Sequence, residues 1–235
     1  MLSDDLAELA APSLRDLLDH PFWAGLRRGT LPGEALVRFV EQDTGHLLPC
    51  YGRAFARCAA AAADDTDAVL LSRCAFETLA SGPRLRAALA DVAPALGVRP
   101  PDPEAGAHHA ARVQCATVTA AAATSWAAGI GALLPFMLFH LEVCEDLRAR
   151  QRPGSRYLPW LAAYLPGDGA RFAVRAVREL TDRFGATATP AETAEAADWF
   201  LRGARCELAF ADAAFTDISA DGPALGPAAP VPPPR

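Results

Sequence analysis

This 235-residue chain has two acidic residues next to apolar helical segments: Asp43 and Glu207. Asp43 follows the largely apolar run at residues 37–40, and Glu207 precedes the apolar run at residues 208–210. A carboxylate that faces inward from such a run can bind a hydrogen-bond donor of a ligand or transfer a proton. The alternative is a solvated side chain on a helix surface, where most acidic residues lie. The apolar neighbours favour the inward placement.

Three further residues could belong to a site: His46, His140 and Tyr164. An isolated histidine is often a hydrogen-bonded residue of the core, and a tyrosine can pack inside with its hydroxyl hydrogen-bonded. Both alternatives stay open at this point. The chain has no lysine. A Schiff-base lysine and a phosphate-loop lysine are therefore excluded.

The cysteines form no C-x-x-C pair and lie mostly in apolar helical segments; they are Cys50, Cys58, Cys74, Cys115, Cys144 and Cys206. We interpret Cys115 and Cys206 as small buried hydrophobic residues. The N-terminus has neither the basic region nor the apolar stretch of a secretory signal. We therefore expect reduced thiols and a cytoplasmic protein.

Composition fits one globular domain, with 51% hydrophobic and 21% charged residues. The net charge of −6 argues against nucleic acid, which requires clustered positive charge. The longest apolar stretch, residues 117–143, contains Ser125, His140 and Glu142 with two glycines and a proline. It suits a buried helix better than a membrane span, so we expect no membrane partner.

Apolar residues recur at helical spacing almost throughout, which predicts an all-α fold. We expect residues 1–220 to form one helical domain and the Pro/Ala/Gly-rich residues 221–235 to form a disordered tail. Pro49 is expected to kink a helix, and Pro83 to begin a new one. The expected helices span residues 4–29 (interrupted near residue 20), 64–82, 83–96, 107–129, 130–150, 169–184 and 189–215, and a further helix begins at residue 30 and continues through Leu48 to the kink at Pro49.

Two segments carry sequence motifs, which are more specific than the overall composition. The first reads H-P-F at residues 20–22, R-G-T-L-P at 28–32 and F-V-E-Q-D at 39–43, and the second reads A-L-L-P at 132–135. Their spacing resembles the TenA/thiaminase II family. Weaker similarities follow at residues 157–164 and 206–212. The resemblance covers roughly residues 14–215.

The resemblance implies a heme-oxygenase-like helical bundle with a small-molecule pocket. Members act on thiamin-related aminopyrimidines, which a cysteine attacks before water releases hydroxymethylpyrimidine. Carried over by position, Asp43 would bind the exocyclic amine of the pyrimidine. Tyr164 and Glu207 would serve as the polar partner and the acid/base. A carboxylate suits an amidine-like N–C–N edge, and a second group is needed to move protons.

The departures from the family pattern concentrate in one wall of that pocket. Phe136 stands where the family places its nucleophilic cysteine. His46 replaces the aromatic residue that stacks on the pyrimidine, and His140 replaces a pocket tyrosine. Ala211 replaces a tryptophan of the last helix. We expect Phe136, His46 and His140 to shape the substrate site.

Di-iron oxygenases share the fold class that the resemblance implies, so a metal alternative has to be considered. His46, His140, Glu77 and Glu207 are the candidate ligands. The late helix at residues 198–202 carries no histidine, so an iron site would lack ligands. We expect no metal and no cofactor.

The function that we predict is cysteine-independent hydrolysis of a thiamin-related aminopyrimidine, with a small molecule as the partner. One rival is a repurposed TenA-like enzyme of a specialised biosynthetic pathway, because function resides in sites rather than folds. A second rival is a small-molecule binding protein without catalysis. Family members commonly form homotetramers, so we expect a homodimer or homotetramer.

Overall fold

The computed structural model describes residues 1–216, except for the side chains of residues 168 and 170. Over this range every regular element is helical, so the all-α prediction is confirmed. The predicted tail at residues 221–235 lies outside the described residues. The elements are α1 (Leu2–Leu9), α2 (Ala11–Asp19), α3 (Pro21–Arg28), α4 (Gly33–Gln42), the π-helix η1 (Asp43–Leu47), α5 (Leu48–Ala61), α6 (Asp65–Leu96), α7 (His109–Thr124), α8 (Trp126–Arg150), α9 (Leu158–Tyr164), α10 (Asp168–Thr187) and α11 (Pro190–Phe215).

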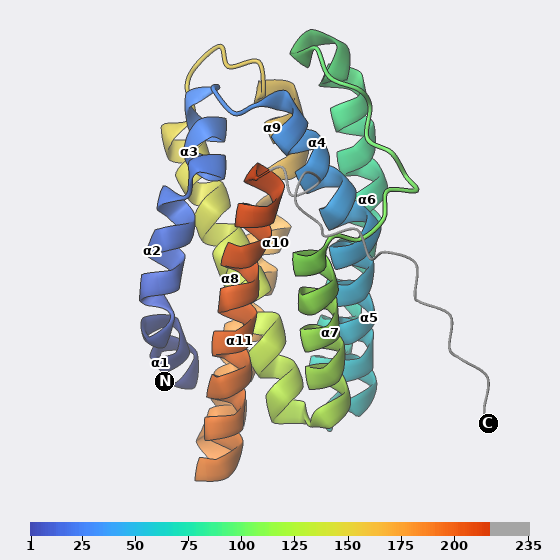
Figure 1. Cartoon of the computed structure of the whole chain (residues 1–235). Helices are drawn as coiled ribbons and strands as arrows, with labels where there is room; N and C mark the ends of the chain where they lie inside the picture. The colour runs from blue at the N-terminus through green and yellow to red at the C-terminus, as the bar shows by residue number, and fades with distance from the viewer. Residues whose placement is uncertain (217–235) are drawn as a thin grey trace, which may run out of the picture.

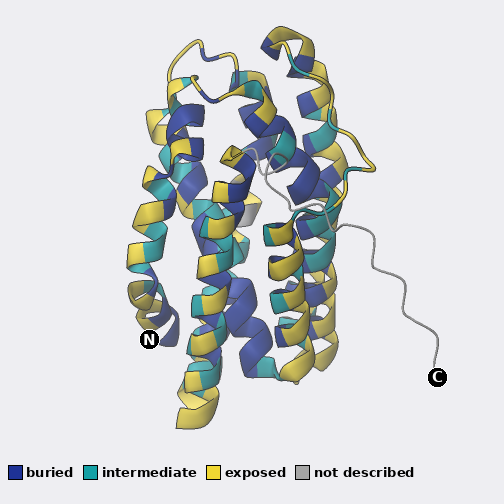
Figure 2. Ribbon diagram, in the orientation of Figure 1, coloured by how far each residue is buried: buried dark blue, intermediate teal, exposed yellow. Residues whose placement is uncertain are grey.

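The helices form a bundle around α8, which packs against α11, α7, α10 and α5 (Figure 1). Buried residues lie on the inward sides of the helices and exposed residues on the outward sides (Figure 2). Close packing of α8 on α11 depends on glycine: a Cβ atom at Gly131 would lie 2.3 Å from the carbonyl oxygen of Ala196. The axes of these two helices can approach because that position carries no side chain.

Of the described helices, α8 is long and apolar enough to cross a membrane by length and composition. Its most apolar window is 72% buried inside the protein. The central helix of a bundle meets the same test, because most of its surface contacts other helices.

Two predicted helix boundaries are wrong. Helix α6 runs without interruption through Pro83, although a break was expected there. Its neighbours hold it together: Leu85 and Leu89 are buried in the core, and Gly82 lies against Thr44. This packing offsets the backbone hydrogen bond that proline cannot donate. The helix expected to end near residue 129 ends instead before Ser125, whose hydroxyl caps α8 by accepting from the Ala128 N–H.

A π-helix takes the place of the kink that was expected at Pro49. The backbone widens into the π-helix η1 just before it, and the Leu48 N–H bonds to the Asp43 carbonyl five residues back. Pro49 then lies in the first turn of α5, where a missing N–H causes little loss. Single π turns inside α-helices are frequent at functional sites. This one carries Asp43.

Candidate active site

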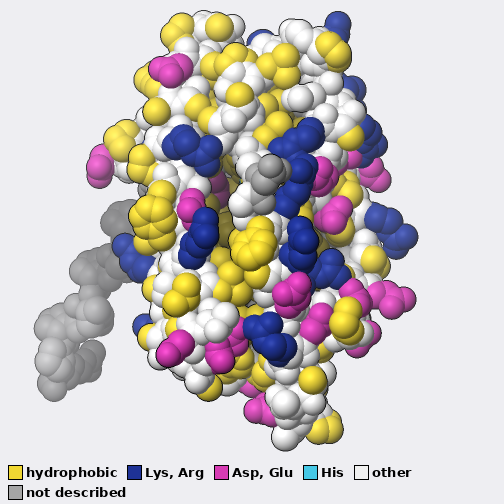
Figure 3. Space-filling model, turned by 180° about the vertical axis from the view of Figure 1, so that it is seen from behind, with side chains coloured by type: hydrophobic (Ala, Val, Ile, Leu, Met, Phe, Trp, Pro, Cys, Tyr) yellow, Lys and Arg dark blue, Asp and Glu magenta, His cyan; other side chains and the backbone are white. Residues whose placement is uncertain are grey.

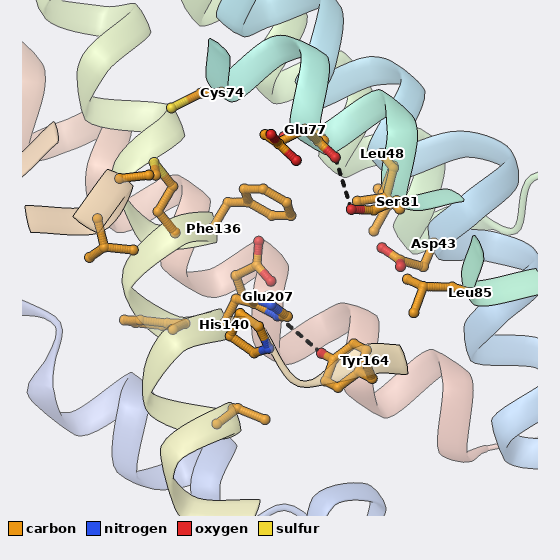
Figure 4. A pocket seen from close by; sticks show the side chains of 18 of the residues that line it. Asp43, Leu48, Cys74, Glu77, Ser81, Leu85, Phe136, His140, Tyr164 and Glu207 are labelled. Carbon is orange, nitrogen blue, oxygen red and sulfur yellow. Dashed lines mark hydrogen bonds between the residues drawn. The ribbon is translucent and has the colours of Figure 1, made fainter. Parts of the chain in front are cut away.

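A cavity of about 390 Å³ lies inside the bundle, between η1, α6, α8, α10 and α11. Five of the six predicted site residues line it: Asp43, Phe136, His140, Tyr164 and Glu207. Figure 4 shows these side chains converging on one space; they come from η1, α8, α9 and α11. The bundle therefore brings together residues that are up to 164 positions apart in the sequence.

Glu207 projects into the cavity from α11 and is held by two donors. The hydroxyl of Tyr51 donates to its Oε1 atom at 3.1 Å, and the amide Nε2 of Gln114 donates to the same oxygen at 2.8 Å. Burial raises the pKa of Glu207 to about 7, against the two hydrogen bonds, which favour the ionised form. A carboxyl that titrates near neutral pH is suited to proton transfer.

Asp43 is buried and enters the cavity from η1. Burial raises the pKa of its carboxyl to about 8, and the charge of Glu207 adds to the effect. Within residues 1–216 no protein group donates a hydrogen bond to this carboxyl. Buried polar groups without a partner are rare in native proteins. The Asp43 carboxyl is therefore placed to accept or share protons with a ligand.

Tyr164 and His140 form a pair at another wall of the cavity. The Tyr164 hydroxyl lies 3.2 Å from the Nδ1 atom of His140. Burial lowers the pKa of His140 to about 4, so the ring is neutral near pH 7. Tyr164 stacks on Trp160, with ring centroids 4.8 Å apart, which fixes its hydroxyl in place.

Phe136 occupies the helix position expected for a nucleophile. Its ring stacks on Tyr51 with a centroid distance of 4.1 Å and an interplanar angle of 17°. On its other side it lies parallel to the ring of His140, at 6.5 Å. The wall that would present a thiol therefore presents an aromatic face.

His46 is the one predicted site residue that does not line this cavity. Its Nε2 atom lies 2.9 Å from the carbonyl oxygen of Ala105, and it lines a separate recess between α5 and α7. The reason is the π-helix. A π turn contains more residues than an α turn. The side chain of His46, three residues after Asp43, therefore points in a different direction from the side chain of Asp43. The expectation that His46 shapes the pocket is therefore wrong.

Cys115 and Cys206, which we expected to be small buried hydrophobic residues, are half-buried and do not line the cavity. Cys74 lines it from α6, but burial raises the pKa of its thiol to about 11. A thiol with so high a pKa is a poor nucleophile near neutral pH. The described lining of the cavity thus offers carboxyl groups rather than a thiolate.

The metal alternative receives no support from the geometry. Among the described residues, no three His, Cys, Asp or Glu side chains converge so that they could hold a metal ion. The recess that His46 faces is not the cavity that His140 and Glu207 share.

Sequence reasoning missed the two residues that hold Glu207, Tyr51 and Gln114. Both are almost completely buried. A single glutamine inside the Ala-rich helix α7 was a usable signal, because a buried amide requires partners. Tyr51 lies eight residues after Asp43. The intervening π turn changes the helical spacing, so the sequence does not reveal that the two side chains face the same site.

Comparison with known proteins defines the class of this bundle. A family model described as the TENA/THI-4/PQQC family matches residues 9–217. The chain belongs to the TENA/THI-4/PQQC family, and the predicted TenA resemblance is confirmed. Membership supports a TenA-like function in general terms.

Solved structures with the same heme-oxygenase-like helical fold include several TenA proteins. A TenA homologue from Pyrococcus furiosus has a TM-score of 0.80 at 18% identity, covering 92% of this chain and 100% of its own. A protein from a Silicibacter species, described as a TenA family transcription regulator, has a TM-score of 0.78 at 22% identity, covering 92% and 97%. A Sulfolobus solfataricus protein, provisionally described as a TenA-like thiaminase, has a TM-score of 0.68 at 17% identity, covering 90% and 95%. A search of curated proteins gave no match.

Proposed function

We propose that this protein hydrolyses a thiamin-related aminopyrimidine by an acid/base route without a cysteine nucleophile. The observation that carries the proposal is the buried carboxyl of Asp43, which no described protein group satisfies and which shares its cavity with Glu207. An aminopyrimidine presents an amine next to a ring nitrogen. A carboxyl can match this amidine-like edge with two hydrogen bonds.

The protonation of the two carboxyls suits this role. Their pKa values of about 8 and about 7 mean that the pair holds roughly one proton near neutral pH. Asp43, as the carboxylic acid, would donate to the ring nitrogen and accept from the exocyclic amine. Glu207 would be ionised, because Tyr51 and Gln114 donate to its oxygen.

The reaction follows from these states. Glu207 takes a proton from a water molecule as the water oxygen bonds to the methylene carbon on the pyrimidine. The bond from that carbon to the leaving amine breaks, and its electron pair departs with the nitrogen. Glu207 delivers this proton to the nitrogen as the bond breaks, so that the group leaves as neutral ammonia. Tyr164, held by neutral His140, is a further polar contact for the substrate.

The direct test uses 4-amino-5-aminomethyl-2-methylpyrimidine as the substrate. We expect the protein to release ammonia and hydroxymethylpyrimidine in equal amounts, measured by an ammonia assay and chromatography. Glu207→Gln should lower kcat by about 10²–10⁴-fold, the usual contribution of a general acid/base. Glu142→Gln is the matched control, because Glu142 is exposed and lies outside the cavity lining. Equal loss in both variants would contradict the assignment.

Intact thiamin should be a poor substrate. Displacing its thiazolium needs an easily ionised nucleophile, and Phe136 offers none. We expect cleavage far slower than about 1 s⁻¹ when thiamin loss is followed by chromatography. Cleavage at about that rate, abolished by Cys74→Ser, would overturn the cysteine-independent route.

Two outcomes of binding experiments distinguish the two alternative functions. Hydroxymethylpyrimidine that binds in calorimetry, without turnover of the aminomethyl compound, would indicate a non-catalytic binding protein. A failure to bind either compound would indicate a TenA-like enzyme with a different small-molecule substrate.

A further inference from the structure

A second recess, of about 430 Å³, lies on the other side of η1 from the active-site cavity. It is formed by η1, α5, the loop before α7 and α7 itself; α5 and α7 lie side by side in Figure 1. Its chemistry-bearing side chains are His46, Cys50, Arg53, Arg57, Arg112 and Cys115. No acidic side chain lines it.

The recess is lined by positively charged side chains, although the protein as a whole has a negative net charge. Arg53 donates to the Pro49 carbonyl at 2.9 Å, and Arg112 donates to the Ala107 carbonyl. Within residues 1–216, neither these two nor Arg57 forms an ion pair with an Asp or Glu. Other arginines of the described chain do so repeatedly. Three guanidinium groups without counter-charges attract anions to this recess.

Two thiols meet at the same place. The sulfur of Cys50 lies 3.3 Å from the hydroxyl of Thr119 and 3.4 Å from the Cys115 carbonyl oxygen. The side chain of Cys115 is the largest cause that lowers the pKa of Cys50, to about 6; Thr119 and Arg53 lower it further, against burial. The Cys115 thiol itself donates to the carbonyl oxygen of His46 at 3.6 Å. The interaction with Cys50 raises the pKa of Cys115. Both residues are partly exposed.

The two cysteines therefore differ in their pKa values although they line the same recess. The lowered pKa of Cys50 favours its thiolate near pH 7, and the raised pKa of Cys115 keeps that residue a thiol. An accessible thiolate next to a second thiol is the arrangement of an attacking and a resolving cysteine. Burial raises the pKa of the four other cysteines, which are Cys58, Cys74, Cys144 and Cys206.

We propose that Cys50 and Cys115 form a thiol–disulfide exchange site for small anionic disulfides, which the arginines of the recess bind. The Cys50 thiolate attacks one sulfur of the disulfide, the sulfur–sulfur bond breaks, and one thiolate leaves. Cys115 then gives up its proton to solvent and attacks Cys50, and the second thiolate leaves. The cysteine pair has lost two electrons, and the small disulfide has been reduced to two thiols.

A disulfide between Cys50 and Cys115 would affect the active-site cavity through two residues that are adjacent to the cysteines in the sequence. Cys50 precedes Tyr51 and Cys115 follows Gln114, and these are the two donors to Glu207. A disulfide of about 2.05 Å is much shorter than the contact between two thiols, so it draws α5 and α7 together. Oxidation is therefore expected to change the hydrogen bonds of Glu207. This consequence rests on the proposed function, whereas the exchange itself does not.

The test follows the reaction of the full chain with 5,5′-dithiobis(2-nitrobenzoate), a dianionic disulfide, at about pH 6. At that pH roughly half of Cys50 is ionised, against about 0.3% of an ordinary thiol. The lower nucleophilicity of a weakly basic thiolate offsets part of this gain, which leaves about a tenfold advantage. We expect a fast phase that releases two equivalents of thionitrobenzoate, with peptide mapping showing a Cys50–Cys115 disulfide.

The variants separate the two cysteines. Cys115→Ser should release one equivalent quickly and leave a stable mixed disulfide on Cys50. Cys50→Ser and Cys50→Ala should both lose the fast phase, with circular dichroism checking that they fold. Cys206→Ser, which removes another partly exposed thiol, should react like the unmodified chain. A fast phase that survives in folded Cys50 variants, or a stable mixed disulfide in the unmodified chain, would overturn the proposal.

The arginines are tested by changing the charge of the reagent. The double variant Arg53→Gln, Arg57→Gln should react about tenfold more slowly with the dianionic disulfide at low salt. With neutral bis(2-hydroxyethyl) disulfide it should react at nearly the rate of the unmodified chain. Equal slowing with both reagents would show that the arginines do not select anions.

Discussion

The carboxyl of Asp43 affects ligand binding and stability in different ways, because it is buried without a described protein donor. For binding, a ligand supplies the missing hydrogen bonds. If the proposed pyrimidine binds, Asp43→Asn should weaken it by roughly 1–3 kcal/mol, the usual loss for a charge-assisted hydrogen bond in a buried site. Isothermal titration with hydroxymethylpyrimidine measures this loss. An unchanged affinity would place Asp43 outside the binding site.

For stability, the same residue predicts a pH dependence. The pKa of its carboxyl rises from 3.8 to about 8 on folding, so the folded chain binds this proton more tightly than the unfolded chain. The stability that this provides is complete below about pH 4 and is lost as the pH rises through 8. Asparagine cannot ionise. The advantage of Asp43→Asn over the unmodified chain should therefore grow by about 2–4 kcal/mol between pH 4.5 and 8.5.

Urea unfolding at the two pH values measures this difference. Glu142→Gln serves as the control, because Glu142 is exposed on α8 and should shift stability equally at both pH values. If the curves of Asp43→Asn and the unmodified chain stay parallel, the Asp43 carboxyl is not protonated in the folded protein.

At the scale of the elements, the contact between α8 and α11 positions the site, since α8 carries Phe136 and His140 and α11 carries Glu207. Gly131→Ala would place a Cβ atom 2.3 Å from the Ala196 carbonyl and force the helices apart. We expect a loss of about 1–3 kcal/mol in the free energy of unfolding. Thermal unfolding followed by circular dichroism provides the measurement.

The matched control for this prediction is Gly169→Ala on α10. A Cβ atom at Gly169 would meet nothing within 4 Å. The same substitution should therefore leave stability unchanged or raise it by up to about 1 kcal/mol, because alanine restricts the unfolded chain. Losses of similar size at both positions would show that the approach of α8 to α11 does not decide the result.

The π-helix η1 has a second consequence at this scale. It turns Asp43 toward the active-site cavity and His46 toward the recess of Cys50 and Cys115. One short segment therefore contributes to two separate sites. A regular α-helix over the same residues would have placed both side chains closer to one face.

At the scale of the whole molecule, the surface combines scattered charges with exposed apolar residues. Seen from behind, the molecule shows arginine and carboxylate side chains interspersed rather than gathered by sign (Figure 3). Val69 and Phe76 are 70% and 68% exposed, seven residues apart on one side of α6. Phe172, on the neighbouring helix α10, is 61% exposed. Large apolar residues in this state are typical of a surface that another subunit covers.

These residues sharpen the prediction of a homodimer or homotetramer. We expect light scattering at micromolar concentration to give a multiple of 24.7 kDa. The double variant Phe76→Glu, Phe172→Glu should dissociate toward the monomer, because charges cannot be buried in such an interface. Glu142→Gln should leave the assembly unchanged. A single 24.7 kDa species for the unmodified chain would contradict the prediction.

Residue types and their spacing were enough to predict the helical fold and five of the residues that line the cavity. Helical periodicity is a local property, so it identified the all-α class. The quoted motifs pointed to the family, and five residues carried over from it line one cavity. Asp43 and Glu207 were also recognisable from their apolar neighbours. Such signals depend on residue type and spacing, which the chain carries before it folds.

The remaining features depend on how the helices pack against one another. Helix α6 continues through Pro83 because its buried residues pack on other helices. His46 leaves the cavity because η1 widens the turn, and a change in helical register is not visible in residue types. Tyr51 and Gln114 meet Glu207 from α5 and α7, and Cys50 meets Cys115 between the same helices. These contacts join residues more than 60 positions apart, so they depend on how helices pack rather than on any local pattern.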